Sequence, residues 1–217
     1  MVEGLLPHAD RLIDIGTDHA YLPIVAIRNG FYQSGIAADI RPGPLAVAAR
    51  NIRRFGLEKS ITTALSDGLA AFSSKDGDVV VMAGLGGLEM IDILDRAPHR
   101  WPILVLQPQK SAPFLRRYLS DSGYQLTREV LCIDDRRLYL GMVAQITDRP
   151  VTDDRVSHYL GPCLLKDKPA LYRPWLEKVK VQVRHEMRRG EDMADVMAAI
   201  EQELDAMDKT REERAQP

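Results

Sequence analysis

The chain has 217 residues, of which 45% are hydrophobic and 28% are charged, and its formal net charge is −2. These values predict a soluble globular protein with one core domain and an appendage, and no apolar stretch is long enough to span a bilayer. No basic leader precedes an apolar core, and the two cysteines form neither a metal-ligand pattern nor a disulfide framework, so we expect a cytoplasmic protein without a metal site.

Short strand-like runs alternate with helix-like stretches up to about residue 147. Strands are expected at Arg11–Ile15, Gly35–Ala38, Ile61–Ala64, Asp78–Ala83, Ile103–Gln107, Tyr124–Ile133 and Leu138–Gln145. Helices are expected at Leu22–Asn29, Leu45–Phe55, Leu88–Ala97 and Ala112–Ser122. The alternation predicts a parallel sheet covered on both faces, and the last two strands, separated only by a polar turn, predict an antiparallel hairpin. This order is typical of the α/β, Rossmann-like class I methyltransferase fold.

The most informative segment is LIDIGTDHAYLP, residues 12–23. An apolar strand ends in an acid and passes through a tight polar loop into a helix, which is where α/β proteins hold nucleotide-like ligands. Acidic residues in this loop would repel a pyrophosphate but suit the cationic sulfonium and ammonium groups of S-adenosylmethionine (SAM). An alternative is that an aspartate only caps the following helix. The candidate cofactor-binding residues here are Asp14, Gly16, Thr17 and Asp18.

Two further acids follow the second and third expected strands. Asp39, followed by Ile40, is placed to bind both ribose hydroxyls of an adenosine. Asp67, followed by Gly68, could accept the exocyclic N–H of adenine, although a simple Asp-Gly turn explains it better when it is considered alone. Because the ends of parallel strands meet at one edge of a sheet, we expect these acids to gather with Asp18.

Two loops complete the predicted site. AGLGG follows the fourth strand, where glycines let cofactor and acceptor approach the backbone closely. LQPQ follows the fifth strand, where neutral amides beside a rigid proline suit a base edge. Ala83 and Gly84 are therefore candidate cofactor-binding residues, and Leu85, Gly86 and Gly87 candidate substrate-binding residues. The catalytic candidates from the second loop are Gln107, Pro108 and Gln109.

The chain beyond residue 147 has a different pattern. Residues 148–168 are rich in proline and polar residues and are expected to form a connector. Two heptad-like apolar stripes follow and predict two helices, joined at Gly190, that pack as an antiparallel hairpin. The stripes consist of Leu171, Trp175, Val179, Val183 and Met187, then Met193, Met197, Ile200, Leu204 and Met207. We therefore expect a SAM-binding domain over residues 1–147 and a helical coiled-coil domain over residues 148–217.

The motifs DIGTDHAYLP, SDGL, AGLGG, LQPQ with the downstream LRRYL, and RRLYLG occur in order along the chain. Together they resemble the bacterial TrmK family of tRNA (adenine-N1)-methyltransferases. The resemblance implies a SAM-binding Rossmann-like domain, a C-terminal coiled-coil domain and methylation of adenine 22 in the tRNA D-arm. Leu85 and Gln109 depart from the more usual AGMGG and LQPN, and family members usually have a longer N-terminus with a helix before the first strand.

The resemblance implies direct transfer of the SAM methyl group to adenine N1. N1 carries an in-plane lone pair, so no general base is needed and the enzyme acts by positioning and electrostatics. His19 is a further catalytic candidate, and Tyr21 and Tyr139 are expected to contact the base or close the pocket, although His19 and Tyr21 could be purely structural. Basic residues of the C-terminal helices, among them Arg184 and Arg188, are expected to bind tRNA, with a monomer as the default state.

Two alternatives remain open at this point. The nearer one is a SAM-dependent methyltransferase that acts on another RNA or on a small molecule, which the acidic net charge slightly favours. The more distant one is a non-catalytic SAM-binding scaffold. A scaffold needs none of the strand-end acids and glycine loops, so the sequence favours an enzyme.

Overall fold

The computed structural model describes residues 1–149, 151 and 154–215. Within them, seven strands form one sheet in the order β3-β2-β1-β4-β5-β7-β6. The strands are β1 (Arg11–Ile15), β2 (Ser34–Asp39), β3 (Ile61–Leu65), β4 (Val79–Ala83), β5 (Ile103–Gln107), β6 (Tyr124–Asp134) and β7 (Arg137–Ile146). The first five are parallel to one another, whereas β7 runs antiparallel to both β5 and β6. The expected parallel sheet with a terminal antiparallel hairpin is confirmed.

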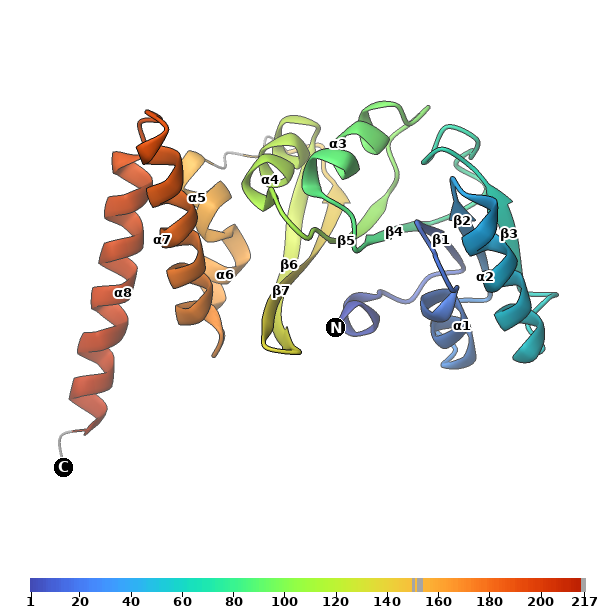
Figure 1. Ribbon diagram of the computed structural model, residues 1–217, viewed down its shortest axis with the longest axis horizontal. Helices are drawn as coiled ribbons and strands as arrows, with labels where there is room; N and C mark the ends of the chain where they lie inside the picture. Colours follow the sequence, from blue (N-terminus) through green and yellow to red (C-terminus); the bar gives the residue numbers. More distant parts are fainter. Residues whose placement is uncertain (150, 152–153, 216–217) are drawn as a thin grey trace.

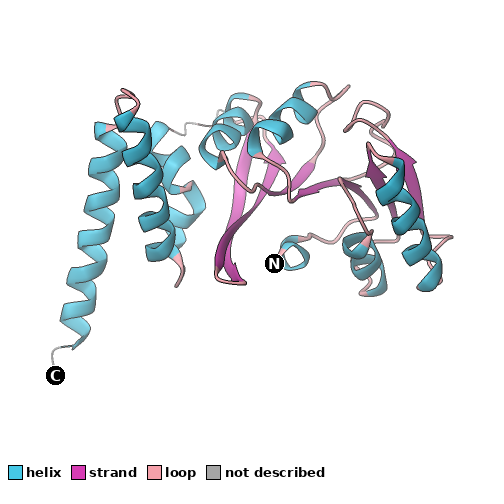
Figure 2. Ribbon diagram, in the orientation of Figure 1, coloured by secondary structure: helices cyan, strands magenta, loops and turns pink. Residues whose placement is uncertain are grey.

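Helices cover both faces of this sheet (Figures 1 and 2). They are α1 (Tyr21–Arg28), α2 (Pro42–Arg54), α3 (Gly87–Asp95) and α4 (Ala112–Asp121). Each lies within a few residues of its expected range. Helix α2 begins earlier than expected because Pro42 occupies its first turn, where the missing N–H of proline costs nothing.

Successive residues of the central strands pack on opposite faces. Leu12 and Val79 belong to the apolar cluster that includes Ala26 of α1, whereas Ile13 and Val80 belong to the cluster under α3 and α4. All four strand residues are fully buried. The strands therefore read as continuous apolar runs, as expected for a sheet covered on both sides.

A 3-10 helix, η1 (Val2–Leu5), precedes β1 and packs against β5, β7 and α1. Leu5 is only 3% exposed. It lies so close to β7 that a Cβ added to Gly141 would be 2.5 Å from its Cδ1 atom. This short turn before the first strand was not among the expected elements.

The C-terminal segment forms four helices at the β6 edge of the sheet (Figure 1). They are α5 (Arg155–Leu160), α6 (Pro162–Asp167), α7 (Tyr172–Arg188) and α8 (Ala194–Ala215). Residues 148–168 were expected to form a connector, and the structure places two short helices, α5 and α6, within them. Asp154 caps α5 by accepting the Ser157 N–H at 2.8 Å, and Pro162 opens α6. Residues 150, 152, 153, 216 and 217 of this expected domain lie outside the described part of the chain.

Helices α7 and α8 lie side by side and run in opposite directions (Figure 1). The predicted stripe residues Trp175, Val179 and Val183 are buried, as are Ile200 and Leu204. They belong to the same apolar cluster as α3, α4 and the strands beneath them. Among the described residues, no helix has both the length and the apolar character needed to cross a membrane.

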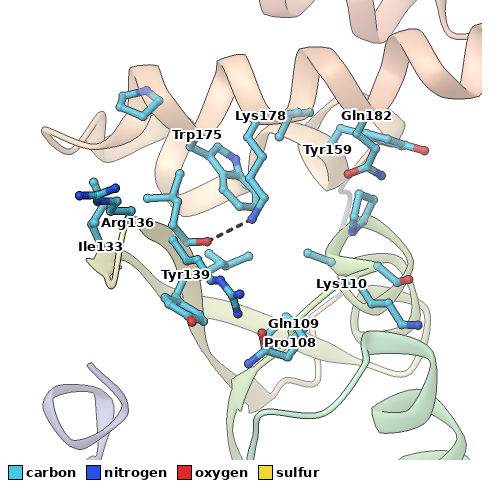
Figure 3. A pocket seen from close by; sticks show the side chains of 18 residues that line it. Pro108, Gln109, Lys110, Ile133, Arg136, Tyr139, Tyr159, Trp175, Lys178 and Gln182 are labelled. Atoms are coloured by element: carbon cyan, nitrogen blue, oxygen red, sulfur yellow. Dashed lines mark hydrogen bonds between the residues drawn. The ribbon is translucent and has the colours of Figure 1, made fainter.

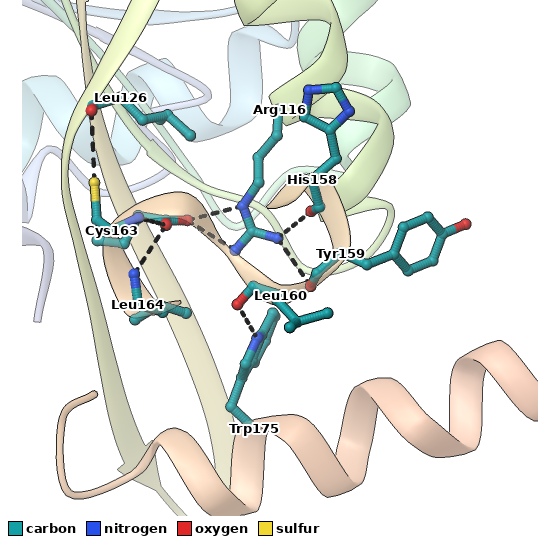
Figure 4. Close-up of polar contacts among 9 residues, drawn as sticks. Arg116, Leu126, His158, Tyr159, Leu160, Cys163, Leu164 and Trp175 are labelled. Atoms are coloured by element: carbon teal, nitrogen blue, oxygen red, sulfur yellow. Dashed lines mark hydrogen bonds and ion pairs between the residues drawn. The ribbon is translucent and has the colours of Figure 1, made fainter. Parts of the chain in front are cut away.

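A buried ion pair joins α4 to the edge strand β6 (Figure 4). Arg116 and Glu129 are both fully buried, and Arg116 Nε donates to Glu129 Oε1 at 2.8 Å. Arg116 Nη1 also donates to the carbonyl oxygen of His158 in α5 at 2.6 Å. The second oxygen of Glu129 accepts the backbone N–H of Cys163 in α6 at 3.0 Å.

We predict that Arg116→Met lowers the free energy of unfolding by about 3–5 kcal/mol, because the substitution leaves the Glu129 carboxylate buried without its countercharge. The control is the neighbouring Arg117→Met, since Arg117 and its partner Asp121 are exposed and their pair is worth about 1 kcal/mol or less. Urea unfolding of both variants measures the difference. Equal decreases in stability would contradict the proposed importance of the buried pair.

Candidate active site

An acidic cavity of about 470 Å³ lies at the C-terminal edge of the parallel strands. It extends across the ends of β1, β2 and β3 and reaches the first turns of α3. Four carboxylates but only two guanidinium groups line it. The charged lining residues are Asp39, Asp67, Glu89, Asp92, Arg41 and Arg96.

Two of the predicted acids lie in this cavity in different surroundings. Asp39 is 4% exposed, and its Oδ1 accepts the backbone N–H of Arg41 at 2.9 Å, which fixes the carboxylate at the end of β2. Asp67 has a side chain that is 59% exposed, and both of its oxygens accept from Arg96, at 2.9 and 3.3 Å. These hydrogen bonds lower the pKa of Asp67, so it stays ionised.

The loop after β1 is tightly held. The Gly16 and Thr17 N–H groups both donate to the carbonyl of Ala38 in β2, at 2.9 and 3.0 Å. Asp18 and Ala20 have φ values of 49° and 57°, a left-handed conformation that is costly for residues other than glycine. Such strain persists only where surrounding contacts enforce it, and it concentrates at functional sites.

Asp14 lies beneath this loop, 5% exposed, and accepts the Thr17 hydroxyl at 2.6 Å. Burial raises its pKa to about 7, the hydrogen bond from Thr17 partly opposes the shift, and the charge of Asp39 adds to it. The neutral and the ionised form of Asp14 are therefore close in free energy near neutral pH. A cationic group near Asp14 would favour its ionised form.

The loops after β4 and β5 are joined by backbone hydrogen bonds that continue the pairing of the two strands. Gln109 N–H donates to Leu85 at 2.9 Å, and Gly87 N–H donates to Lys110 at 2.9 Å. A Cβ added to Gly87 would lie 2.7 Å from the carbonyl oxygen of Ser111, so only glycine allows this approach. The two loops therefore form one rigid unit.

Gln107 lies inside this unit and is 6% exposed. Its Oε1 accepts the Gly84 N–H at 3.1 Å, and its Nε2 lies 3.3 Å from the carbonyl oxygen of Pro108. The side chain thus holds the glycine loop in place and does not line either of the two cavities at this edge.

A second cavity, of about 540 Å³, lies beside the first, between the β5 loop, the β6–β7 turn and α7 (Figure 3). Three aromatic and four basic side chains line it, and none of its described lining residues is acidic. Lys178 Nζ donates to the Leu138 carbonyl at 3.1 Å and lies 5.7 Å from the centre of the Trp175 ring. The aromatic and basic residues are Tyr139, Tyr159, Trp175, Lys110, Arg136, Arg137 and Lys178.

The structure brings about half of the predicted site residues to these cavities. Those in the acidic cavity are Gly16, Asp39, Ile40, Asp67, Gly68 and Leu85, and those in the basic cavity are Pro108, Gln109 and Tyr139. The predicted residues that line neither cavity are Asp14, Thr17, Asp18, His19, Tyr21, Ala83, Gly84, Gly86, Gly87, Gln107, Arg184 and Arg188. Several of these, including Gly84, Gly87 and Gln107, instead build the loops that shape the cavities.

His19 and Tyr21 lie together on the rim of the β1 loop, with ring centres 5.5 Å apart. Tyr21 is 59% exposed, and His19 Nε2 lies 3.4 Å from Asp18 Oδ2. The backbone carbonyl of His19 accepts Asn51 Nδ2 at 3.0 Å, which ties the loop to α2. His19 therefore contributes to the structure of the β1 loop through its backbone carbonyl.

The basic residues of the second cavity were not predicted as site residues. Arg136 and Arg137 were visible as a pair in the predicted hairpin turn, and because β6 runs parallel to β5, that turn lies at the same edge as Gln109. Arg184 was predicted instead of Lys178, but six residues along α7 rotate it by roughly 120° away from the cavity. Among the described residues, no group of three or more His, Cys, Asp or Glu side chains is arranged to hold a metal ion.

Comparison with known proteins gives consistent matches. Residues 12–209 match the family model TrmK, described as tRNA (adenine(22)-N(1))-methyltransferase. The tRNA (adenine(22)-N(1))-methyltransferase of Bacillus subtilis strain 168 is 32% identical over 187 residues, which are 82% of this chain and 79% of that protein. The crystal structure of the B. subtilis M1A22 tRNA methyltransferase TrmK superposes with a TM-score of 0.76 at 26% identity, covering 96% and 94% of the two chains. Streptococcus pneumoniae Sp1610 in complex with S-adenosyl-L-methionine gives 0.83 at 28% identity, covering 94% and 96%.

We predict that Asp14 makes the stability of the protein fall between about pH 4 and pH 7. The pKa is higher in the folded chain, about 7, than in the unfolded chain, so in this window the folded state binds more protons and raising the pH favours unfolding. Asp14→Asn should remove this slope and stabilise the protein at pH 8 by up to ~4 kcal/mol. Urea unfolding at pH 5 and pH 8 tests this, with the exposed Asp10→Asn as control, and an unchanged pH slope in Asp14→Asn would refute it.

Proposed function

The chain belongs to the TrmK family, the tRNA (adenine(22)-N(1))-methyltransferases, and we propose that it transfers a methyl group from SAM to N1 of adenine 22 in the D-arm of tRNA. The observation that carries the proposal is that an acidic and a basic cavity lie side by side at the C-terminal edge of one sheet. The acidic cavity suits a cation without phosphates, and the basic cavity suits a polyanion.

The acidic cavity is proposed to hold SAM, which supplies the methyl group when bound. Asp39 binds the two ribose hydroxyls, and Asp67 accepts an exocyclic N–H of adenine, with Ile40 and Gly68 beside them. Asp14, Thr17 and Asp18 set the charge around Gly16, which favours the cationic part of the cofactor. Ala83 and Gly84 let the cofactor approach the end of β4. The similar S. pneumoniae protein is in complex with S-adenosyl-L-methionine, which supports SAM as the cofactor.

The acceptor adenine is proposed to lie where the two cavities meet. Its N1 faces the pairing partner in a duplex, so the base must be unpaired or extruded before it reacts. Pro108, Gln109 and Tyr139 line the basic cavity and are assigned to the base, while Gln107 holds the Gly84–Gly87 loop beside it. His19 and Tyr21 form an aromatic rim from the other side. No general base is required, because the N1 lone pair is free to attack.

The tRNA backbone is proposed to follow the basic cavity and continue along α7 to Arg184 and Arg188, which are exposed. Helices α7 and α8 are proposed to form a coiled-coil hairpin, with the domain boundary near residue 147. A cytoplasmic monomer with no metal ion is sufficient for this reaction. The aromatic ring of Tyr139, which is half-buried, offers a stacking surface to an unpaired base.

Methyl transfer from labelled SAM to unmodified tRNA tests the proposal directly. We predict that the product contains N1-methyladenosine, identified by mass spectrometry, and that transfer is lost when adenine 22 is replaced by guanine. The guanine substrate serves as the matched control, because it differs only at the target. Transfer that persists with this substrate, or a different methylated nucleoside, would reject the proposed site of methylation.

We predict that replacing Lys110, Arg136 and Arg137 together by alanine raises the KM for tRNA about tenfold or more. The log–log slope of binding against salt should also decrease by about 0.7–0.9 for each phosphate that the variant no longer neutralises. The affinity for SAM should not change. The control replaces Arg53, Arg54 and Lys59, three exposed basic residues at the other end of the sheet. Filter binding over a series of salt concentrations measures both slopes, and equal effects of the two triple variants would disprove a specific role of the cavity.

A further inference from the structure

The orientation of the Gln107 side-chain amide is fixed by a backbone group. The atom of Gln107 that lies 3.1 Å from the Gly84 nitrogen must be an acceptor, because a backbone N–H can only donate. Oε1 of Gln107 is therefore the atom that faces Gly84. Its Nε2 then lies 3.3 Å from the Pro108 carbonyl, which accepts a hydrogen bond from it. The hydrogen bonds at the two ends of the Gln107 amide are thus consistent with the same orientation.

This orientation determines the orientation of Gln109. The Gln109 side chain approaches the same Gln107 oxygen at 3.3 Å, and only its Nε2 can make a favourable contact with an acceptor. Its own Oε1 is consequently directed away from Gln107. Within the described part of the chain, no hydrogen bond to Gln109 Oε1 is found, and Gln109 is exposed. A short chain of hydrogen bonds therefore runs from Gly84 through Gln107 to Gln109. The side-chain oxygen of Gln109, at the end of this chain, accepts no hydrogen bond from the described residues.

Gln109 lines one cavity and is hydrogen-bonded through its backbone to a residue that lines the other. The Gln109 side chain lines the basic cavity, as Figure 3 shows. Its backbone N–H donates to the carbonyl of Leu85 at 2.9 Å, and Leu85 lines the acidic cavity. A base that lies in the basic cavity with its reactive ring nitrogen toward the acidic cavity would have its Watson–Crick edge near Gln109.

We propose that Gln109 Oε1 accepts a hydrogen bond from the 6-amino group of the acceptor base, and that this contact selects 6-aminopurines over 6-oxopurines. Adenine presents an N–H donor at position 6 beside the N1 lone pair, which matches a fixed acceptor. Guanine and hypoxanthine present a carbonyl oxygen there, which would face the Gln109 oxygen without a proton between them. The inference rests on the proposed function and adds the group that reads the base.

The test compares two tRNA substrates, one with adenine and one with 2-aminopurine at position 22. In 2-aminopurine the amino group is moved from position 6 to position 2, while the N1 lone pair is kept. The measured quantity is the ratio of kcat/KM for adenine to kcat/KM for 2-aminopurine. Any difference in intrinsic reactivity between the two bases cancels when this ratio is compared between the native protein and Gln109→Leu. We expect the ratio to fall about 2- to 10-fold in Gln109→Leu, the value of one hydrogen bond.

The matched control is Gln145→Leu, an exposed glutamine of β7 at the opposite end of the β5–β7 ladder, which should leave the ratio unchanged. An unchanged ratio in Gln109→Leu would overturn the inference while leaving the proposed function intact. Failure of the native protein to methylate the adenine substrate would instead reject the proposed function.

A second pair of variants decides the matter if Gln109→Leu has too little activity to measure. Gln107→Leu removes the acceptor that orients Gln109 and should lower the ratio. Gln107→Glu, measured at a pH low enough to protonate the buried carboxyl group, keeps an acceptor toward Gly84 and Gln109 and a donor toward the Pro108 carbonyl, and should preserve the ratio. Equal ratios in the two Gln107 variants would overturn the inference, because a purely structural role of Gln107 would not separate them in base selectivity.

Discussion

The arrangement of the whole molecule depends on the buried guanidinium of Arg116. An unpaired buried charge costs several kcal/mol, so the surrounding groups must match its donors closely. Glu129 of β6 and the carbonyl of His158 in α5 do so, and the ring of Trp175 in α7 lies 5.5 Å from the Arg116 Cζ atom. Helix α7 also carries Lys178, on the wall of the basic cavity opposite the β5 loop. The buried ion pair therefore lies next to the helix that forms one wall of that cavity.

The sheet could be predicted from the sequence because its signals are local. Each parallel strand is a short apolar run that ends at a polar or glycine residue, and all seven were placed to within one residue of each end. Helices α5 and α6 carry weaker signals, a capping Asp154 and an initiating Pro162. Each has only six residues, too few for apolar periodicity. Their positions depend on residues far away in the sequence, since Arg116 donates to His158 of α5 and Glu129 accepts from Cys163 of α6.

The candidate site was predictable where it depends on topology and unpredictable where it depends on side-chain direction. Asp39 and Asp67 reach the acidic cavity because parallel strands end at one edge. The burial of Gln107 depends on the register of β4 and β5, which pairs Ala83 with Gln107 and brings Gly84 to its amide. The packing of Trp175 determines which side of α7 faces the cavity. The sequence alone therefore could not show that Lys178, and not Arg184, lines it.

The opposite charges of the two cavities have a consequence for inhibitor design. Four carboxylates line one cavity and four cationic side chains line the other, although the net charge of the chain is only −2. A single molecule that spans both must therefore be a zwitterion with a cationic end beside Asp39 and an anionic end beside Lys178. Between the two ends it needs a narrow, planar linker that passes Leu85 and Gln109. A compound that carries charge of one sign only would be attracted electrostatically by one cavity and repelled by the other.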